Sequence, residues 1–285
     1  MSLKTNRELM EHAAAHGYAV GAFNVNNLEQ IRGVIEAAVE EKAPAIVAVT
    51  EGAIKHGGWP LFCNALLRMA AEAPVPISVH LDHGGKFDNV VKSIVGGFTS
   101  VMYDCSTLSF EENAAEMRRV VAVARPVGVS VEGEIGHVGG KEAGVANSGD
   151  EEVLTDPDEA AKFAESSMVD SLAVAVGTVH GMRKQTAKID LDRVSAIAAV
   201  VKCPLVLHGA SGVPNEVFEE VIRRGIRKIN IGTELQKTFA AGVRAFLAEN
   251  PDAIDVRKFL KPGIENLKEA ARTKMRLFKS SGMAW

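Results

Sequence analysis

The sequence predicts an α/β fold: a closed (β/α)8 barrel of the TIM-barrel type with an extra C-terminal helix. Three observations predict it. Short apolar runs recur along the 285 residues, helical patterns separate them, and most runs are continuously apolar, as in parallel strands buried on both faces. A succession of strand–helix units favours a closed barrel, and an open doubly wound sheet is the alternative.

The apolar runs give the expected strands in order. They are Ala19–Asn24, Ala45–Val49, Ile77–Leu81, Ser100–Tyr103, Val129–Ile135, Ser171–Val176, Leu205–Leu207 and Lys228–Ile231. Amphipathic patterns between them predict helices such as Leu28–Lys42 and Phe110–Ala124, and Pro262–Lys279 predicts the extra helix at the end. No linker or change of composition interrupts the pattern, so we expect residues 1–285 to form a single domain.

Composition limits the classes of partner. The chain is 47% hydrophobic and 24% charged, as is usual for globular proteins, and its net charge of −4 argues against nucleic acid or an anionic membrane as partner. No run approaches the roughly 20 apolar residues of a membrane span. The three cysteines are widely spaced and form no CxxC motif, which is typical of a reducing compartment. We therefore expect a cytoplasmic protein.

Polar or ionisable residues follow nearly every apolar run. In a barrel of this kind, the loops at the carboxyl ends of the strands carry the chemistry. The residues at these ends are Asn24, Thr50, Glu51, Asp82, His83, Asp104, Glu134, Gly177 to His180, His208 and Asn230. Loops that only confer solubility more often carry Lys, Ser, Asn and Gly, so this set predicts a functional site at one rim.

Three histidines in this set predict a metal centre. His83, His180 and His208 follow the third, sixth and seventh expected strands. Three imidazoles from separate rigid elements, with a fourth position left open, are the arrangement of catalytic zinc. Taken singly, each is more often a hydrogen-bonded loop histidine, and the three together favour the metal.

Two glycine-containing segments, His208–Val213 and Asn230–Glu234, follow the last two expected strands and lead into helices. Small residues at these positions let backbone N–H groups approach an anion at a helix N-terminus, which indicates a phosphate site. Tight turns without a ligand are the alternative. The pair Gly139-Gly140 opens a long loop that reaches about Thr155 and carries Glu142, and loops of this length are usually lids or binding loops.

Seven ordered segments resemble the class II, metal-dependent ketose-bisphosphate aldolases, closest to the tagatose-bisphosphate and fructose-bisphosphate branches. They are Gly17–Gln30, His80–Gly84, Ser100–Ser106, Ser130–Gly140, Asp170–Met182, Pro204–Gly212 and Lys228–Leu235. The similarity covers nearly the whole chain in order.

The resemblance implies roles for the ionisable residues. His83, His180 and His208 would bind Zn²⁺, and acids matching Asp104 and Glu134 lie near a second divalent metal position in the family. Asp82 would take the C4-hydroxyl proton during cleavage. Glu142 matches the residue that exchanges the C3 proton of dihydroxyacetone phosphate. A monovalent cation, Na⁺ or K⁺, is a further habit of the family.

Substrate contacts are implied in the same way. The residues that match the phosphate cradle, with the strand-end residues beside it, are Asn24, Thr50, Gly181, Arg183, Gly209, Ala210, Ser211, Asn230, Gly232 and Thr233. Three positions depart from the fructose-type pattern, because Gly232 replaces a frequent Asp, Gln236 replaces an Arg, and Arg183 stands where relatives commonly have Tyr.

The expected activity is the reversible cleavage of tagatose or fructose 1,6-bisphosphate into dihydroxyacetone phosphate and glyceraldehyde 3-phosphate. One alternative is an aldolase for a ketose 1-phosphate with a different acidic group at C6. Another is a non-catalytic partner subunit of such an aldolase. The expected partners are small sugar phosphates and further copies of the chain, as a homodimer or homotetramer.

Overall fold

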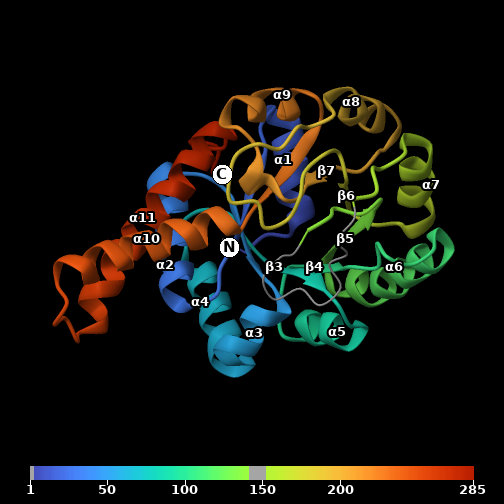
Figure 1. Cartoon of the computed structure of the whole chain (residues 1–285). Coiled ribbons are helices and arrows are strands. Elements are labelled where there is room, and N and C mark those ends of the chain that lie inside the picture. The colour runs from blue at the N-terminus through green and yellow to red at the C-terminus, as the bar shows by residue number, and fades with distance from the viewer. Residues whose placement is uncertain (1–2, 141–151) are drawn as a thin grey trace.

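The structure, a computed structural model, describes residues 3–140 and 152–285. Within these residues, eight parallel strands close into a barrel in the order β1 to β8, and β8 pairs with β1 through Val20 and Lys228. Figure 1 shows the helices arranged around the outside of the strands. The predicted (β/α)8 barrel is confirmed, and the open-sheet alternative is excluded.

The strands lie close to the expected positions. They are β1 (Val20–Asn24), β2 (Ala45–Val49), β3 (Ile77–Gly84), β4 (Ser100–Tyr103), β5 (Ser130–Ile135), β6 (Ser171–Val174), β7 (Leu205–Leu207) and β8 (Ile226–Ile231). The largest difference is at β3, which continues past Leu81 and therefore includes Asp82 and His83. This extension brings two site residues onto the barrel itself.

The helices connect these strands and cover them. They are α1 (Asn6–His16), α2 (Leu28–Glu41), α3 (Glu51–Gly57), α4 (Asn64–Glu72), α5 (Phe87–Val95), α6 (Phe110–Ala124), α7 (Pro157–Ser167), α8 (Leu191–Val200), α9 (Phe218–Arg223), α10 (Thr233–Glu249) and α11 (Val256–Leu277). Among the described residues, no helix is both long enough and apolar enough to cross a membrane.

The extra C-terminal helix α11 is present, but the start predicted at Pro262 is wrong. The helix begins at Val256, because the Asp255 side chain caps it by accepting a hydrogen bond from the Arg257 backbone N–H. Pro262 lies inside the helix, opposite Gly242 of α10, where a side chain on the glycine would collide with the Pro262 backbone. The proline thus marks a close helix–helix contact.

Helix α1 closes the amino-terminal end of the barrel. Its residue Met10 packs against Ala173 of β6 and Val206 of β7, and Leu9 packs with residues of β1 and β2. Asn6 of the same helix reaches the ring of His80 inside the barrel. The bottom of the barrel is therefore filled, and its polar interior residues lie above this plug.

Alternation along the strands places pairs of polar residues inside the barrel. Successive side chains of a strand point to opposite faces, so residues two apart share a face. Glu132 and Glu134 of β5 form one such pair, and Lys228 and Asn230 of β8 form another. All four are buried. Glu134 and Asn230 lie at the carboxyl rim, and Glu132 and Lys228 lie beneath it.

Candidate active site

Three histidines converge at the carboxyl rim of the barrel. His83 is the second-last residue of β3, His208 directly follows β7, and His180 lies in the segment after β6. One ring nitrogen of each lies within 4.8 Å of those of the others, and all three residues are buried. A tetrahedral zinc ion with bonds of about 2.0–2.1 Å separates its ligand atoms by roughly 3.4 Å, so small adjustments of the rings suffice. The described residues thus include a group that can hold a metal ion.

The backbone of His83 turns this ligand toward the other two. Alternation places His80 and Asp82 inside the barrel, which would direct His83 outward. However, His83 has φ +49°, and the pairing of β3 with β4 shifts register between Leu81 and Gly84. A non-glycine residue in the left-handed region is strained, and such strain gathers at functional sites.

Hydrogen bonds on the outer ring nitrogens fit two of these histidines for a metal. Asp104 Oδ2 lies 2.8 Å from His83 Nδ1, and Glu132 Oε1 lies 2.9 Å from His208 Nε2. An ionised carboxylate only accepts hydrogen bonds, so the outer nitrogens, His83 Nδ1 and His208 Nε2, are the donors. In the neutral rings the inner nitrogens, His83 Nε2 and His208 Nδ1, then keep a lone pair. These inner nitrogens face each other at 2.9 Å. Two lone pairs at this separation need a positive charge between them, which either a proton on His83 or a divalent ion such as Zn²⁺ supplies.

A second group of possible metal ligands shares His83 with the first. It consists of His83, Asp104 and Glu134, whose ligand atoms also lie within 4.8 Å of one another. Burial and the neighbouring Asp104 raise the pKa of the Glu134 carboxyl to about 7. Its Oε2 is buried and accepts no hydrogen bond from the described residues. A proton or a cation would therefore stabilise this carboxyl, which matches the second divalent position that the sequence implied.

Asp82 is held in place by two amides beside the histidines. Asn24 Nδ2 donates to Asp82 Oδ2 at 2.7 Å, and Asn230 Nδ2 donates to Oδ1 at 3.1 Å. Burial alone would raise the pKa of this carboxyl, but the surrounding cationic groups, among them His83 and Lys228, outweigh burial and lower it. Asp82 is therefore a fixed, ionised carboxylate. In this structure the side chains of Asn24 and Asn230, which the sequence assigned to substrate, orient this carboxylate.

The predicted phosphate cradle lies at the ends of β7 and β8. Gly209 has φ +64°, and a side chain there would meet the Val179 backbone at 3.0 Å, so only glycine fits easily. The Ser211 hydroxyl accepts a hydrogen bond from the Glu234 backbone N–H in the first turn of α10. Ala210 and Gly232 are buried, whereas Gly181 is exposed. Backbone donors and a helix N-terminus thus converge where the sequence predicts an anion.

Two basic residues line a cavity of about 270 Å³ that includes Ser211 and Thr233. They are Arg183 and Lys237, and Lys237 Nζ donates to the Arg183 backbone carbonyl at 3.2 Å. Glu234 also lines the cavity, so its two basic residues leave an excess of one positive charge beside the cradle. The sequence singled out Arg183 alone, but Lys237 lies one turn after Thr233 on α10, so helical spacing could have found it.

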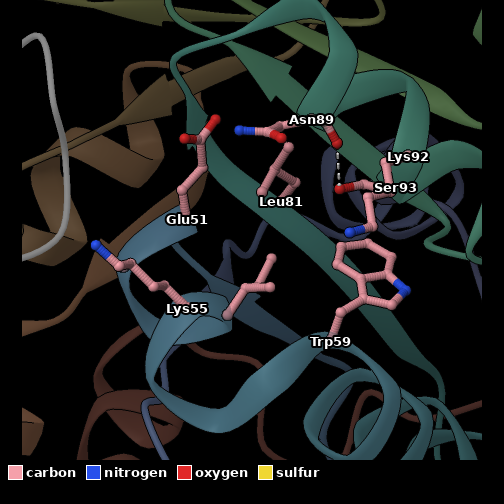
Figure 2. Close-up of a pocket in the computed structure, with 9 residues that line it drawn as sticks. Glu51, Lys55, Trp59, Leu81, Asn89, Lys92 and Ser93 are labelled. Carbon is pink, nitrogen blue, oxygen red and sulfur yellow. Dashed lines mark hydrogen bonds between the residues drawn. The ribbon is translucent and has the colours of Figure 1, made fainter.

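A second cavity, of about 350 Å³, lies between α3 and α5 (Figure 2). Its wall includes Leu81, which points away from the barrel interior because it alternates with His80 and Asp82. In the figure Lys92 lies over Trp59, at 4.9 Å from the ring centroid. Strand β3 therefore separates this cavity from the metal ligands.

Residues around this second cavity still support the site. Glu51 Oε1 accepts a hydrogen bond from the Gly85 backbone N–H at 2.8 Å, two residues after His83. Thr50 caps α3 by accepting a hydrogen bond from the Ala53 backbone N–H at 3.3 Å, so its hydroxyl has a structural partner.

Glu142, the predicted catalytic residue of the long loop, lies outside the described residues.

The comparisons with known proteins find similarity along nearly the whole chain, and they point to the same family. The model of the family described as fructose-bisphosphate aldolase class-II matches residues 4–283. The chain belongs to this family. It is therefore an aldolase, a carbon–carbon lyase of carbohydrate metabolism.

Individual relatives cover the full chain. A fructose-bisphosphate aldolase of Thermus caldophilus is 44% identical over 99% of this chain and 100% of its own. The crystal structure of the YdjI aldolase from Escherichia coli K12 has a TM-score of 0.86 at 34% identity, covering 99% of this chain and 100% of that one. The crystal structure of a putative fructose-1,6-biphosphate aldolase from Coccidioides immitis has a TM-score of 0.86 at 31% identity, covering 97% of this chain and 96% of that one.

Proposed function

We propose that the protein reversibly cleaves a ketose 1,6-bisphosphate, fructose or tagatose 1,6-bisphosphate, into dihydroxyacetone phosphate and glyceraldehyde 3-phosphate, with Zn²⁺ held by His83, His180 and His208. The convergence of the three histidines beside the fixed carboxylate of Asp82 supports this most directly. The relatives from Thermus caldophilus and Coccidioides immitis, which are named for fructose bisphosphate, support the substrate.

The histidines and Asp82 have separate roles in the proposed reaction. A divalent ion held by His83, His180 and His208 would supply Lewis-acid stabilisation of the negative charge that develops when the C3–C4 bond breaks. Asp82 accepts the C4-hydroxyl proton as this bond breaks and returns it in the condensation. Asn24 and Asn230 hold the carboxylate for this transfer, since each donates to one of its oxygens. Glu142 would exchange the C3 proton of the three-carbon ketose phosphate.

The cradle binds the C1 phosphate. Backbone groups of Gly181, Gly209, Ala210 and Ser211 surround the anion from β6 and β7, and the N-terminus of α10, at Gly232 and Thr233, completes the site from β8. Arg183 and Lys237 add positive charge beside it. Thr50 and Asn24 lie at the ends of β2 and β1, where they would meet the sugar hydroxyls of the far half.

A substrate with a different acidic group at C6 is the second candidate. Gly232 and Gln236 lack the carboxylate and the guanidinium expected of fructose-type members, and Arg183 adds a cation. The set of Asp82 with three convergent histidines argues against a non-catalytic partner subunit, because catalysis needs that set and a scaffold does not.

A cleavage panel with the zinc-loaded protein tests the substrate. Fructose and tagatose 1,6-bisphosphate are compared with ketose 1-phosphates that carry a carboxylate or a hydroxyl at the far end. We expect the highest kcat/KM on a bisphosphate, and an Arg183→Gln variant to lose affinity for phosphate-bearing substrates. A higher kcat/KM on a carboxylate-bearing ketose 1-phosphate would replace the first candidate by the second.

We infer that the protein is a homodimer or homotetramer. The hairpin of α10 and α11 extends away from the barrel (Figure 1), and at its tip Ile254 is 92% exposed and Val256 is 56% exposed. Apolar side chains on a projecting arm favour a contact with another copy. Light scattering of the native chain and of Ile254→Asp should show an oligomer that the substitution weakens, and a monomeric native chain would refute the inference.

We also infer a reducing, cytoplasmic location. Cys63, Cys105 and Cys203 are all free thiols. Burial raises the pKa of Cys63 to about 11 and of the other two to about 12, so they are unreactive. Free buried thiols are usual where glutathione keeps cysteines reduced.

A further inference from the structure

A buried ion pair lies beneath the histidines, inside the barrel. Glu132 of β5 and Lys228 of β8 are both 0% exposed, and Lys228 Nζ lies 2.8 Å from each oxygen of the carboxylate. Removing two charges from water is costly, and replacing a buried pair by apolar residues is often neutral or stabilising. Stability alone therefore gives no good reason for this pair.

The carboxylate has a second partner, which is a metal ligand. Glu132 Oε1 accepts a hydrogen bond from His208 Nε2 at 2.9 Å. This bond fixes the tautomer, because the proton is held at Nε2 and the lone pair is left at Nδ1. Nδ1 is the atom that faces His83 Nε2. Glu132 therefore selects the nitrogen that His208 presents to a metal and sets the orientation of the ring.

The lysine in turn holds the carboxylate. Its ammonium contacts both oxygens of Glu132, so the carboxylate cannot rotate away from His208 without breaking a two-point contact. Lys228 Nζ also lies 3.5 Å from His80 Nε2, and Ser100 Oγ lies 2.9 Å from His80 Nδ1. The pair is thus anchored on the opposite side from the metal ligands by polar side chains of the barrel interior.

We propose that Glu132 and Lys228 are positioning residues for the metal ligand His208: Glu132 fixes its tautomer and orientation, and Lys228 fixes Glu132. The inference rests on the proposed metal site. Loss of this pair should therefore change zinc affinity and the geometry of coordination, whereas loss of a purely structural pair would affect folding alone.

The test is a graded series of variants. Glu132→Gln keeps an acceptor but loses the charge, and Glu132→Met/Lys228→Met removes both charges together, so that no unpaired ion stays buried. The control is Ser100→Ala, which removes a buried hydrogen bond to His80 but none to His208. Zinc affinity is measured by competition with a chromophoric chelator, coordination by the visible absorption of the Co²⁺-loaded protein, and folding by the Tm of the metal-free protein.

We expect zinc affinity to fall about tenfold in Glu132→Gln and about a hundredfold in the double variant, with altered Co²⁺ absorption in both. The metal-free double variant should keep a Tm close to that of the native chain, and Ser100→Ala should keep native zinc affinity. A folded double variant with native zinc affinity and native Co²⁺ absorption would overturn the inference alone. A native chain that binds no zinc would overturn the proposed metal site itself, and the inference with it.

Discussion

The Asp82→Ala variant is expected to bind zinc normally and to lose kcat by a factor on the order of 10²–10⁴. The physical reason is the position of the carboxylate, which is buried beside the histidines and fixed by Asn24 and Asn230. Removing it takes away the group that accepts the C4-hydroxyl proton, whereas the three imidazoles stay. Cleavage rates at saturating substrate and zinc content per chain measure the two effects separately.

The matched control for this variant is Asp88→Ala, which removes an exposed carboxylate from the first turn of α5. It should keep native kcat and native zinc content. An Asp82→Ala protein that released its zinc and kept its turnover would show that Asp82 is a ligand and that the proton goes elsewhere.

The His83→Ala variant is expected to lose zinc and activity together. His83 is the residue shared by both groups of possible metal ligands, and its Nδ1 is held by Asp104 at 2.8 Å. With this ring removed, His180 and His208 are the only imidazoles left in the group, which is an incomplete zinc site. The loss of kcat should therefore be at least as large as in Asp82→Ala, and zinc content should fall with it.

The control here is His56→Ala, which removes an exposed histidine from α3 and should change neither property. If His83→Ala kept one tightly bound zinc per chain, the ligand set would have to be reassigned to other residues.

The fold was predictable from the sequence because parallel strands that are buried on both faces have continuously apolar sequences. The run Leu205–Leu207 is only three residues long, yet it was found where β7 lies. The end of β3 was missed because Asp82 and His83 are polar, although they continue the strand. The start of α11 differs from the predicted one because proline is common in the first turn of a helix, whereas here the Asp255 side chain caps the helix and Pro262 lies inside it.

The candidate site was predictable where chemistry and position coincide. Polar residues at the carboxyl ends of strands identified His83, His180 and His208, which the structure brings together. Glu132 and Lys228 were not predicted, because each lies inside an expected strand rather than at its carboxyl end. The signal was present, since each lies two residues before a rim residue, Glu134 or Asn230, and so faces the same interior.

Partner choice among polar side chains could not be predicted. The family resemblance implied that Asn24 and Asn230 contact the substrate, and the structure adds that both side chains donate to Asp82. Only the closure of the barrel brings the ends of β1 and β8 next to β3 across its interior. Pairings of this kind depend on the three-dimensional arrangement of strands and are invisible in a linear pattern.

The account depends on one divalent ion bound by three imidazoles at the barrel rim. The most direct test is to remove metal from the native chain with a chelator and then titrate Zn²⁺ back while following cleavage of fructose 1,6-bisphosphate and tagatose 1,6-bisphosphate. The account predicts that cleavage disappears on metal removal and returns as zinc refills this site. Full cleavage by the metal-free chain would contradict it.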